Sequence, residues 1–215
     1  MSGSGVELEI KLLVDADEAE LLATSLGEPQ RIEQQHNVYF DTAGGAWGQA
    51  GFGVRLRSTG GGTITLTLKG RGHSVGDFVA RGEWELELPA ARWLALTTGQ
   101  ESLAPELDRL AQTEGVRLPP ALPRVLAPFG FTETTRRVFA LPGEGPALAL
   151  ELDRTRYPDE SIVYEVELEI PDASHEPAAR KRLEAVLAHA GVGYRPSTVS
   201  KLQRLMLVLD RRADG

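Results

Sequence analysis

The sequence predicts an α+β fold built on an eight-stranded antiparallel β-barrel, a tunnel with a charged interior and flanking helices. Three observations support this prediction. About eight segments alternate between apolar and charged residues, which is the pattern of a strand with one apolar and one charged face. Most connections between these segments are short, which favours antiparallel pairing. The charged positions are also sorted by sign within each strand, whereas a face that meets water usually mixes several kinds of polar residue.

The first half of the chain supplies five of the expected strands and one helix. A helix is expected over residues 15–26, because Asp15 or Asp17 can cap its start, acidic residues follow, and Gly27 comes after its end. The glycines at 60–62 predict a hairpin turn, and the glycine-rich stretch 70–76 predicts a flexible loop or a lid over one tunnel end. The strands are expected at residues 6–12, 36–41, 53–57, 63–69 and 83–88.

The second half of the chain begins with a change of pattern. Leucines are spread among Pro, Gly and Glu between about residues 90 and 125, which predicts a helical insertion packed on one side of the barrel. Strands are expected again at residues 131–141, 147–153 and 162–170. An amphipathic helix is expected over 174–189, with Gly191 as its stop, and residues 197–209 are expected to hold a last strand or helix. We treat residues 1–215 as a single domain.

The bulk properties of the chain exclude several classes of function. The 215 residues carry a formal net charge of −8, which argues against general binding to nucleic acid or to an anionic membrane. The absence of cysteine excludes disulfides, zinc–thiolate sites and thiol catalysis. The first five residues lack the basic and apolar parts of a signal peptide, and no apolar run reaches the roughly 20 residues of a membrane-spanning helix. We therefore expect a soluble cytoplasmic protein.

The charged faces of the strands are best explained by a shared interior. Residues at i and i+2 point to the same side of a strand, so each acidic strand places carboxylates side by side, which costs stability unless a cation binds them. A divalent ion is the natural partner because hard cations prefer oxygen ligands, while the basic positions suit a phosphate chain. If helices cover the apolar faces, the charged faces must line a lumen. The acidic positions are Glu7, Glu9, Glu83, Glu85, Glu87, Glu151, Asp153, Glu165, Glu167 and Glu169, and the basic ones are Lys11, Arg55, Arg57, Lys69, Arg136 or Arg137, and Lys201.

The order of these motifs resembles that of the CYTH superfamily, also called the triphosphate tunnel metalloenzymes. The resemblance begins with Glu7-Leu-Glu9-Ile-Lys11, which is similar to the family's ExExK strand, and it covers roughly residues 6–205. A lone ExExK has little specificity, but the ordered set is strongly specific. The other matching segments are Tyr39-Phe-Asp41-Thr, Arg55-Leu-Arg57, Lys69, Glu83-Trp-Glu85, Thr135-Arg-Arg137, Glu151-Leu-Asp153, Tyr164-Glu-Val-Glu167-Leu-Glu169 and Ser200-Lys201-Leu.

The resemblance implies that the tunnel binds Mg²⁺ or Mn²⁺ through its carboxylates and a triphosphate through its Lys and Arg residues. Of the neighbours Arg136 and Arg137, only one should enter the tunnel, and we favour Arg137. The implied metal ligands are Glu7, Glu9, Asp153, Glu165 and Glu167. The implied phosphate-binding residues are Lys11, Arg55, Arg57, Lys69, Arg137 and Lys201. The implied catalytic residues are Glu7, Glu9, Lys11 and Glu85, with Glu83 or Glu85 as a base or a further ligand.

The function implied by the resemblance is metal-dependent hydrolysis of the terminal phosphate of a small-molecule triphosphate. The helical stretch and the chain length are most similar to the branch of thiamine triphosphatases and inorganic triphosphatases. One alternative is an adenylate cyclase of the CYTH type, in which a ribose 3′-oxygen attacks phosphorus in place of water. Another is a non-catalytic module that binds polyphosphate or nucleotides. The sequence leaves open which triphosphate, which metal and how many ions are used, and which oligomer forms.

Overall fold

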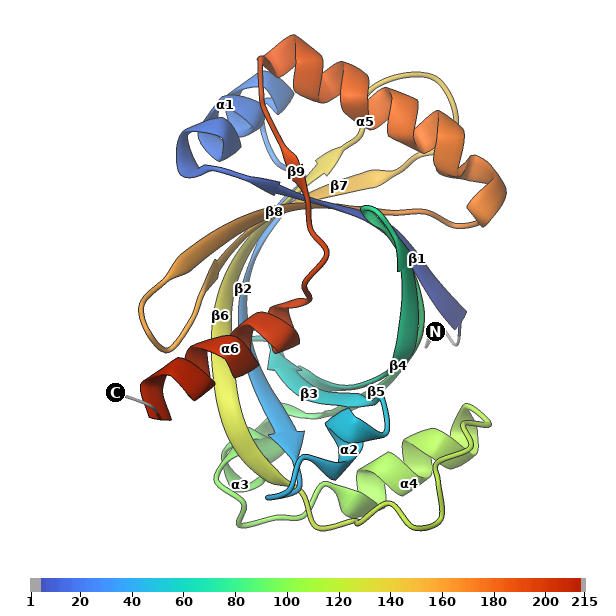
Figure 1. Ribbon diagram of the computed structural model, residues 1–215, viewed down its shortest axis with the longest axis vertical. Helices are drawn as coiled ribbons and strands as arrows, with labels where there is room; N and C mark the ends of the chain where they lie inside the picture. The colour runs from blue at the N-terminus through green and yellow to red at the C-terminus, as the bar shows by residue number, and fades with distance from the viewer. Residues whose placement is uncertain (1–4, 214–215) are drawn as a thin grey trace.

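A computed structural model describes residues 5–213 as a closed antiparallel β-barrel of eight strands (Figure 1). The strands pair in the order β5-β4-β3-β2-β6-β7-β8-β1, and β1 also pairs with β5, which closes the ring. The fold class predicted from the alternating segments is therefore confirmed. The strands are β1 (Gly5–Val14), β2 (Arg31–Asp41), β3 (Gly53–Ser58), β4 (Thr63–Val75), β5 (Phe78–Pro89), β6 (Ala127–Ala140), β7 (Ala149–Arg156) and β8 (Ile162–Glu169).

Helices lie on two opposite outer sides of the barrel (Figure 1). On one side, α1 (Ala16–Leu26) and α5 (Glu176–Ala190) cover the apolar faces of β1, β7 and β8, where Ile10 and Leu168 are fully buried. On the other side, α2 (Ala46–Gln49), α3 (Trp93–Thr97) and α4 (Ala104–Thr113) cover β3, β4 and β5, where Leu56 and Leu66 are fully buried. Burying such a side chain contributes about 1.5–3 kcal/mol. Because the apolar faces point outward into these two cores, the charged faces point into the barrel.

The ends of the long helices follow from local sequence. Asp15 caps α1, and its backbone N–H donates to the Glu18 carboxylate at 2.8 Å, which completes a capping box. The helix α5 follows the short 3₁₀ turn η2 (Ala173–His175) and ends where Gly191 adopts a φ of 69°. That left-handed conformation favours glycine. Another 3₁₀ turn, η1 (Ala90–Arg92), precedes α3.

The C-terminal segment crosses one mouth of the barrel (Figure 1). The chain leaves α5, forms the two-residue strand β9 (Arg195–Pro196) against β1, and continues into α6 (Lys201–Ala213). Within residues 197–209, where a last strand or helix is expected, the element is the helix α6, and the short strand β9 lies just before this range. The apolar side of α6 is buried with Tyr39 and Tyr157 through Leu205 and Val208. A Cβ on Gly130 would lie 3.0 Å from Leu205 Cδ2, so this glycine lets the helix approach the barrel wall.

The stretch 70–76 differs from the expectation of a loop. Residues up to Val75 continue β4, and Gly72 lies opposite Arg81 in a ribbon with β5. Cross-strand hydrogen bonds satisfy the backbone of this glycine-rich segment, which the side-chain pattern alone does not reveal. The glycines make room for neighbours: a Cβ on Gly82 would lie 2.4 Å from the Trp84 ring.

Two sequence expectations concern features outside the barrel itself. Residues 1–4, most of the segment tested for a signal peptide, lie outside the described part of the chain. Within residues 5–213, no helix combines the length and the apolar character needed to cross a membrane.

Candidate active site in the barrel lumen

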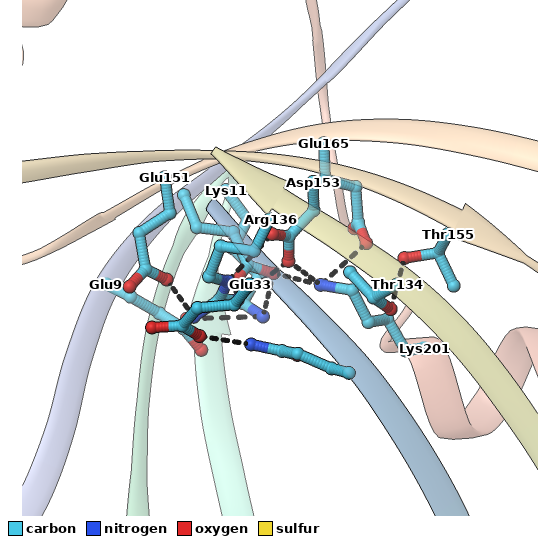
Figure 2. A network of polar contacts seen from close by, with 12 residues as sticks. Glu9, Lys11, Glu33, Thr134, Arg136, Glu151, Asp153, Thr155, Glu165 and Lys201 are labelled. Atoms are coloured by element: carbon cyan, nitrogen blue, oxygen red, sulfur yellow. Dashed lines mark hydrogen bonds and ion pairs between the residues drawn. The ribbon is translucent and has the colours of Figure 1, made fainter. Parts of the chain in front are cut away.

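The charged faces of the strands meet inside the barrel, where carboxylates and cations pair directly (Figure 2). Asp153 is fully buried and Glu165 is 1% exposed, and buried charges of this kind require paired, hydrogen-bonded partners. Strand alternation explains the arrangement because every second side chain points inward. The charged lumen residues that pair with one another are Glu7, Glu9, Lys11, Arg55, Lys69, Arg81, Glu83, Glu85, Arg136, Glu151, Asp153, Glu165, Glu167, Lys201 and Arg204.

One group of these residues lies at the seam where β1 closes on β5, and we call Glu7, Glu9, Lys69, Arg81 and Glu83 the seam cluster. Lys69 Nζ lies 3.2 Å from both Glu7 carboxylate oxygens and 2.8 Å from Glu83 Oε2. Arg81 Nε donates to Glu7 Oε2 at 2.7 Å, and Arg81 Nη2 donates to Glu9 Oε1 at 3.0 Å. Burial by itself raises the pKa of Glu7, but the charges of Lys69 and Arg81 outweigh it and hold that pKa well below its ordinary value.

A second group lies on β7 and β8, and we call its four carboxylates Glu151, Asp153, Glu165 and Glu167 the wall cluster. The ladder between the strands places Glu151 opposite Glu167 and Asp153 opposite Glu165. Like charges placed directly opposite each other destabilise a sheet unless something neutralises them.

Four cations neutralise the wall cluster: Arg136, Lys201 and Lys11 contact Asp153 or Glu167, and Arg204 of α6 contacts Glu165. Arg136 donates from Nε and Nη2 to the two Asp153 oxygens at 2.7 and 2.6 Å, and from Nη2 to Glu167 Oε2 at 2.7 Å. Lys201 Nζ, from the start of α6, lies 2.9 Å from Asp153 Oδ2 and 2.5 Å from Glu167 Oε1. Lys11 Nζ donates to the same Glu167 oxygen at 2.9 Å. Burial raises the pKa of Glu167, yet Lys11, Lys201 and Arg136 together lower it well below its ordinary value.

Glu151 differs from the other three members of the wall cluster. Burial raises the pKa of its carboxyl to about 7, because the charge of Arg136 compensates only partly and the charge of Glu167 adds to the increase. A carboxyl with this pKa exchanges a proton near neutral pH. The sequence marked Glu151 as one of an acidic pair but did not include it among the implied site residues.

The two arginines of β3 contact side chains of the neighbouring strands β2 and β4. Arg55 Nη2 donates to Thr67 Oγ1 at 3.1 Å, and Thr67 Oγ1 donates to Glu85 Oε1 at 3.0 Å. Arg57 Nε donates to Asn37 Oδ1 at 3.0 Å, and no carboxylate in the described part of the chain forms a salt bridge with it. Burial, together with the nearby charges of Arg55 and Arg136, lowers the pKa of Arg57 to about 10. This guanidinium is therefore a cation whose lumen partner is a neutral amide.

The preference for Arg137 as the tunnel residue is wrong. The guanidinium of Arg137 points away from the lumen and donates to Glu20 of α1 at 3.0 and 2.8 Å. Arg136 is the lumen residue because the β6–β7 ladder places it opposite Asp153, whereas Arg137 lies opposite the outward-facing Leu152. The Thr-Arg-Arg motif alone does not show which of its side chains point into the barrel. Pairing with the neighbouring strand β7 shows this.

Sequence reasoning also missed two lumen arginines. Arg81 lies two residues before Glu83 on the same strand, so the rule of alternation could have found it. Arg204 lies three residues after Lys201 on α6, and its Nη1 donates to Glu165 Oε1 at 2.8 Å. Spacing by three on a helix also places two side chains on one face.

The donor chemistry of the lumen fits a hard divalent cation. The candidate ligands offer only carboxylate oxygens. Glu165 Oε2 is buried and accepts no hydrogen bond, and its charge is met by Lys201 Nζ at 3.1 Å. Within residues 5–213, no three carboxylate or imidazole groups already converge as a metal cage. Guanidinium and ammonium groups instead stand between the carboxylates and supply the charge compensation that a metal ion would supply.

The chain matches one protein-family model and is similar to several solved structures. Residues 5–205 match the model of the CYTH domain. HpAC1 from Hippeastrum, a candidate adenylyl cyclase with a dominant triphosphatase activity, is 25% identical with a TM-score of 0.78, over 93% of this chain and 95% of that one. A candidate adenylate cyclase from Bacillus halodurans is 23% identical with a TM-score of 0.66, over 94% and 98%. PH1819 from Pyrococcus horikoshii is 18% identical with a TM-score of 0.54, over 94% and 99%. No curated protein sequence matches significantly.

Proposed function

The chain belongs to the CYTH domain family, and we propose that it hydrolyses the terminal phosphoanhydride bond of a small-molecule triphosphate, either inorganic triphosphate or thiamine triphosphate. The observation that supports this proposal is the interleaving of buried carboxylates and buried cations in one lumen. Carboxylates suit a hard divalent cation, and Lys and Arg suit phosphate oxygens. The dominant triphosphatase activity of HpAC1 adds support.

The cations of the lumen are the proposed phosphate-binding groups. Arg57 donates to a neutral amide, so a phosphate oxygen is a better partner than the one it has. Lys201 and Arg204 enter from α6, which ties phosphate binding to the docking of that helix. The proposed set is Lys11, Arg55, Arg57, Lys69, Arg136 and Lys201, with Arg136 taking the role that the sequence gave to its neighbour.

The carboxylates Glu7, Glu9, Asp153, Glu165 and Glu167 are the proposed ligands for Mg²⁺ or Mn²⁺, which when bound neutralises charge on the phosphate oxygens. In the proposed reaction a water oxygen forms a bond to the terminal phosphorus while the anhydride P–O bond breaks. The bond's electron pair leaves with the diphosphate, and a carboxylate of the lumen takes the water proton.

Two carboxylates are candidates for the base. Glu85 is held beside Arg55 by the hydroxyl of Thr67, which donates to Glu85 Oε1. Glu151 is the second candidate because its pKa of about 7 lets it accept and release a proton at neutral pH. Comparing Glu85→Gln with Glu151→Gln separates them: only the variant that lacks the base should lose the chemical step while it still binds substrate.

The experiment that tests the proposed function measures phosphate release from inorganic triphosphate, thiamine triphosphate and ATP, each with Mg²⁺, Mn²⁺ or EDTA. Metal-dependent release of phosphate that is strongest with one of the first two substrates is the expected result. Pyrophosphate together with cyclic AMP would instead indicate the cyclase reaction. Tight binding of triphosphate without turnover of any substrate would overturn the hydrolase and leave a binding module.

A further inference from the structure

Arg81 lies at the barrel seam beside Glu7 and Glu9, the two carboxylates of β1 that are proposed above as metal ligands. The β1–β5 ladder sets Arg81 directly opposite Glu7. Its guanidinium then reaches both carboxylates of the first strand, Glu7 at 2.7 Å and Glu9 at 3.0 Å. One side chain therefore bridges the two acidic residues that begin the Glu-x-Glu-x-Lys strand, and it does so with two charge-assisted hydrogen bonds.

The bridge is buried and firmly held. The side chains of Arg81, Glu7 and Glu9 are 13%, 18% and 5% exposed, so solvent screens their attraction little. Burial lowers the pKa of Arg81, but the charges of Glu7 and Glu9 reverse this effect and raise it above its ordinary value. The guanidinium therefore stays charged at every pH at which the protein is folded.

The ribbon that carries Arg81 is anchored at its tip. Asp77, in the turn between β4 and β5, accepts from Arg180 Nη1 and Nη2 of α5 at 2.8 and 2.7 Å. The backbone carbonyl of Asp77 also accepts from the N–H of Lys11 at 2.8 Å. Gly72 leaves room beneath the arginine, since a Cβ there would lie 3.1 Å from Arg81 Cβ. These contacts hold the backbone at the tip of the ribbon, so separation of Arg81 from the carboxylates requires only a rotation of side chains.

We propose that Arg81 is the internal cation of the Glu7–Glu9 pair, and that a divalent metal must displace its guanidinium in order to bind there. Arg81 therefore sets the metal concentration at which the site fills. The displaced guanidinium remains in the lumen, where an oxygen of the bound triphosphate is its next partner. Metal and triphosphate then strengthen each other's binding by the same factor, as linkage requires. This inference rests on the proposed function, because it concerns the metal and the substrate of that same site.

The test measures Mn²⁺ binding by electron paramagnetic resonance, with no substrate present, to the wild type and to Arg81→Met. The variant should bind Mn²⁺ about tenfold more tightly or better, because the ion no longer competes with two charge-assisted hydrogen bonds. Arg57→Met is the matched control: it removes a lumen cation that pairs with an amide, and its Mn²⁺ affinity should change by less than about threefold. Unchanged or weaker Mn²⁺ binding by Arg81→Met would overturn the proposal.

A second measurement on the wild-type protein remains decisive if Arg81→Met does not fold. The Nε–Hε resonance of Arg81, assigned by its loss in Arg81→Lys, should shift on titration with Mg²⁺ and shift again when a non-hydrolysable imido analogue of triphosphate is added. A resonance that does not respond to Mg²⁺ would overturn the proposal.

The proposal for Arg81 and the proposed hydrolase function fail in different ways. Normal phosphate release with an unresponsive Arg81 overturns the role of Arg81 alone, whereas a displaced Arg81 without phosphate release overturns the hydrolase alone.

Discussion

Arg136 and Asp153 face each other across the β6–β7 ladder and form a two-pronged ion pair inside the barrel, with nitrogen–oxygen distances of 2.7 and 2.6 Å. Asp153 is fully buried, so this pair is shielded from solvent. The next residue, Arg137, pairs outside the barrel with Glu20, whose side chain is 67% exposed. Two adjacent arginines therefore form ion pairs of similar geometry in opposite environments, which makes them a matched pair for mutation.

Arg136→Met should destabilise the metal-free protein far more than Arg137→Met. Loss of Arg136 leaves the buried carboxylates of the wall cluster one cation short, and removing one partner from a buried ion-pair network costs about 3–5 kcal/mol, whereas an exposed pair contributes at most about 1 kcal/mol. The free energy of unfolding is measured by urea denaturation in EDTA, so that no metal compensates. Equal losses in the two variants would mean that the lumen charges are neutralised in another way.

Glu9→Gln should abolish metal-dependent turnover. Glu9 is 4% exposed and is bridged by Arg81, and its loss removes a proposed metal ligand, so we expect phosphate release to fall by about a hundredfold or more. Glu20→Gln, on the outer face of α1, is the control and should keep the wild-type rate. Retention of the wild-type rate by Glu9→Gln at saturating metal would show that this carboxylate is not part of the site.

Glu151 should make the stability of the metal-free protein depend on pH. Its pKa is about 7 in the folded protein against an ordinary value of 4.5, so the folded state binds this proton more tightly than the unfolded state. The group therefore lowers the free energy of unfolding as pH rises from about 4.5 through about 7, by roughly 3 kcal/mol in total. Urea denaturation at several pH values should show this loss in the wild type relative to Glu151→Gln. Parallel pH profiles of the two proteins would refute the raised pKa.

Leu205→Ala should weaken the docking of α6 and, through it, phosphate binding. Leu205 is fully buried in the cluster with Tyr39 and Tyr157, and such a truncation costs about 2–5 kcal/mol. Amide hydrogen exchange in α6 should become faster, and the KM for triphosphate should rise because Lys201 and Arg204 lie on this helix. Met206→Ala, at a side chain that is 47% exposed, should change neither quantity.

Much of the fold follows from the sequence because the strands of the barrel have a local signature, the alternation of apolar and charged residues. Alternation within β1, β3 and β4 predicted both the strands and the faces that point inward, and glycine stops predicted the ends of two helices. The glycine-rich composition of the stretch 70–76 predicts a loop, but β4 continues there through backbone pairing with β5. Composition says little about such pairing. For a similar reason the sequence does not predict which side chains of β6 point into the barrel. Arg136 and Arg137 are distinguished only by their partners on β7 and α1.

The residue types of the candidate site were predictable, but its ion pairs were not. Which cation meets which carboxylate depends on distances across the lumen between strands far apart in sequence, as with Lys11 and Glu167, which are 156 residues apart. Arg81 was predictable from alternation alone, and was missed because the resemblance rests on the strand segments that follow it. Arg204 required knowledge that the last segment is a helix, which places it beside Lys201.

The position of β1 between β5 and β8 has a consequence for how the protein is made. This strand is synthesised before the other strands of the barrel, yet its partner β8 begins only at Ile162. At roughly 5–20 residues per second, the nascent strand waits on the order of ten seconds before its full set of partners exists. During this time the backbone of β1 lacks its complete ladder, and an unpaired strand edge promotes misfolding and recruits chaperones. The ladder between β1 and β8, and with it the pairing of Lys11 with Glu167 in the lumen, can form only after the second half of the chain has been translated.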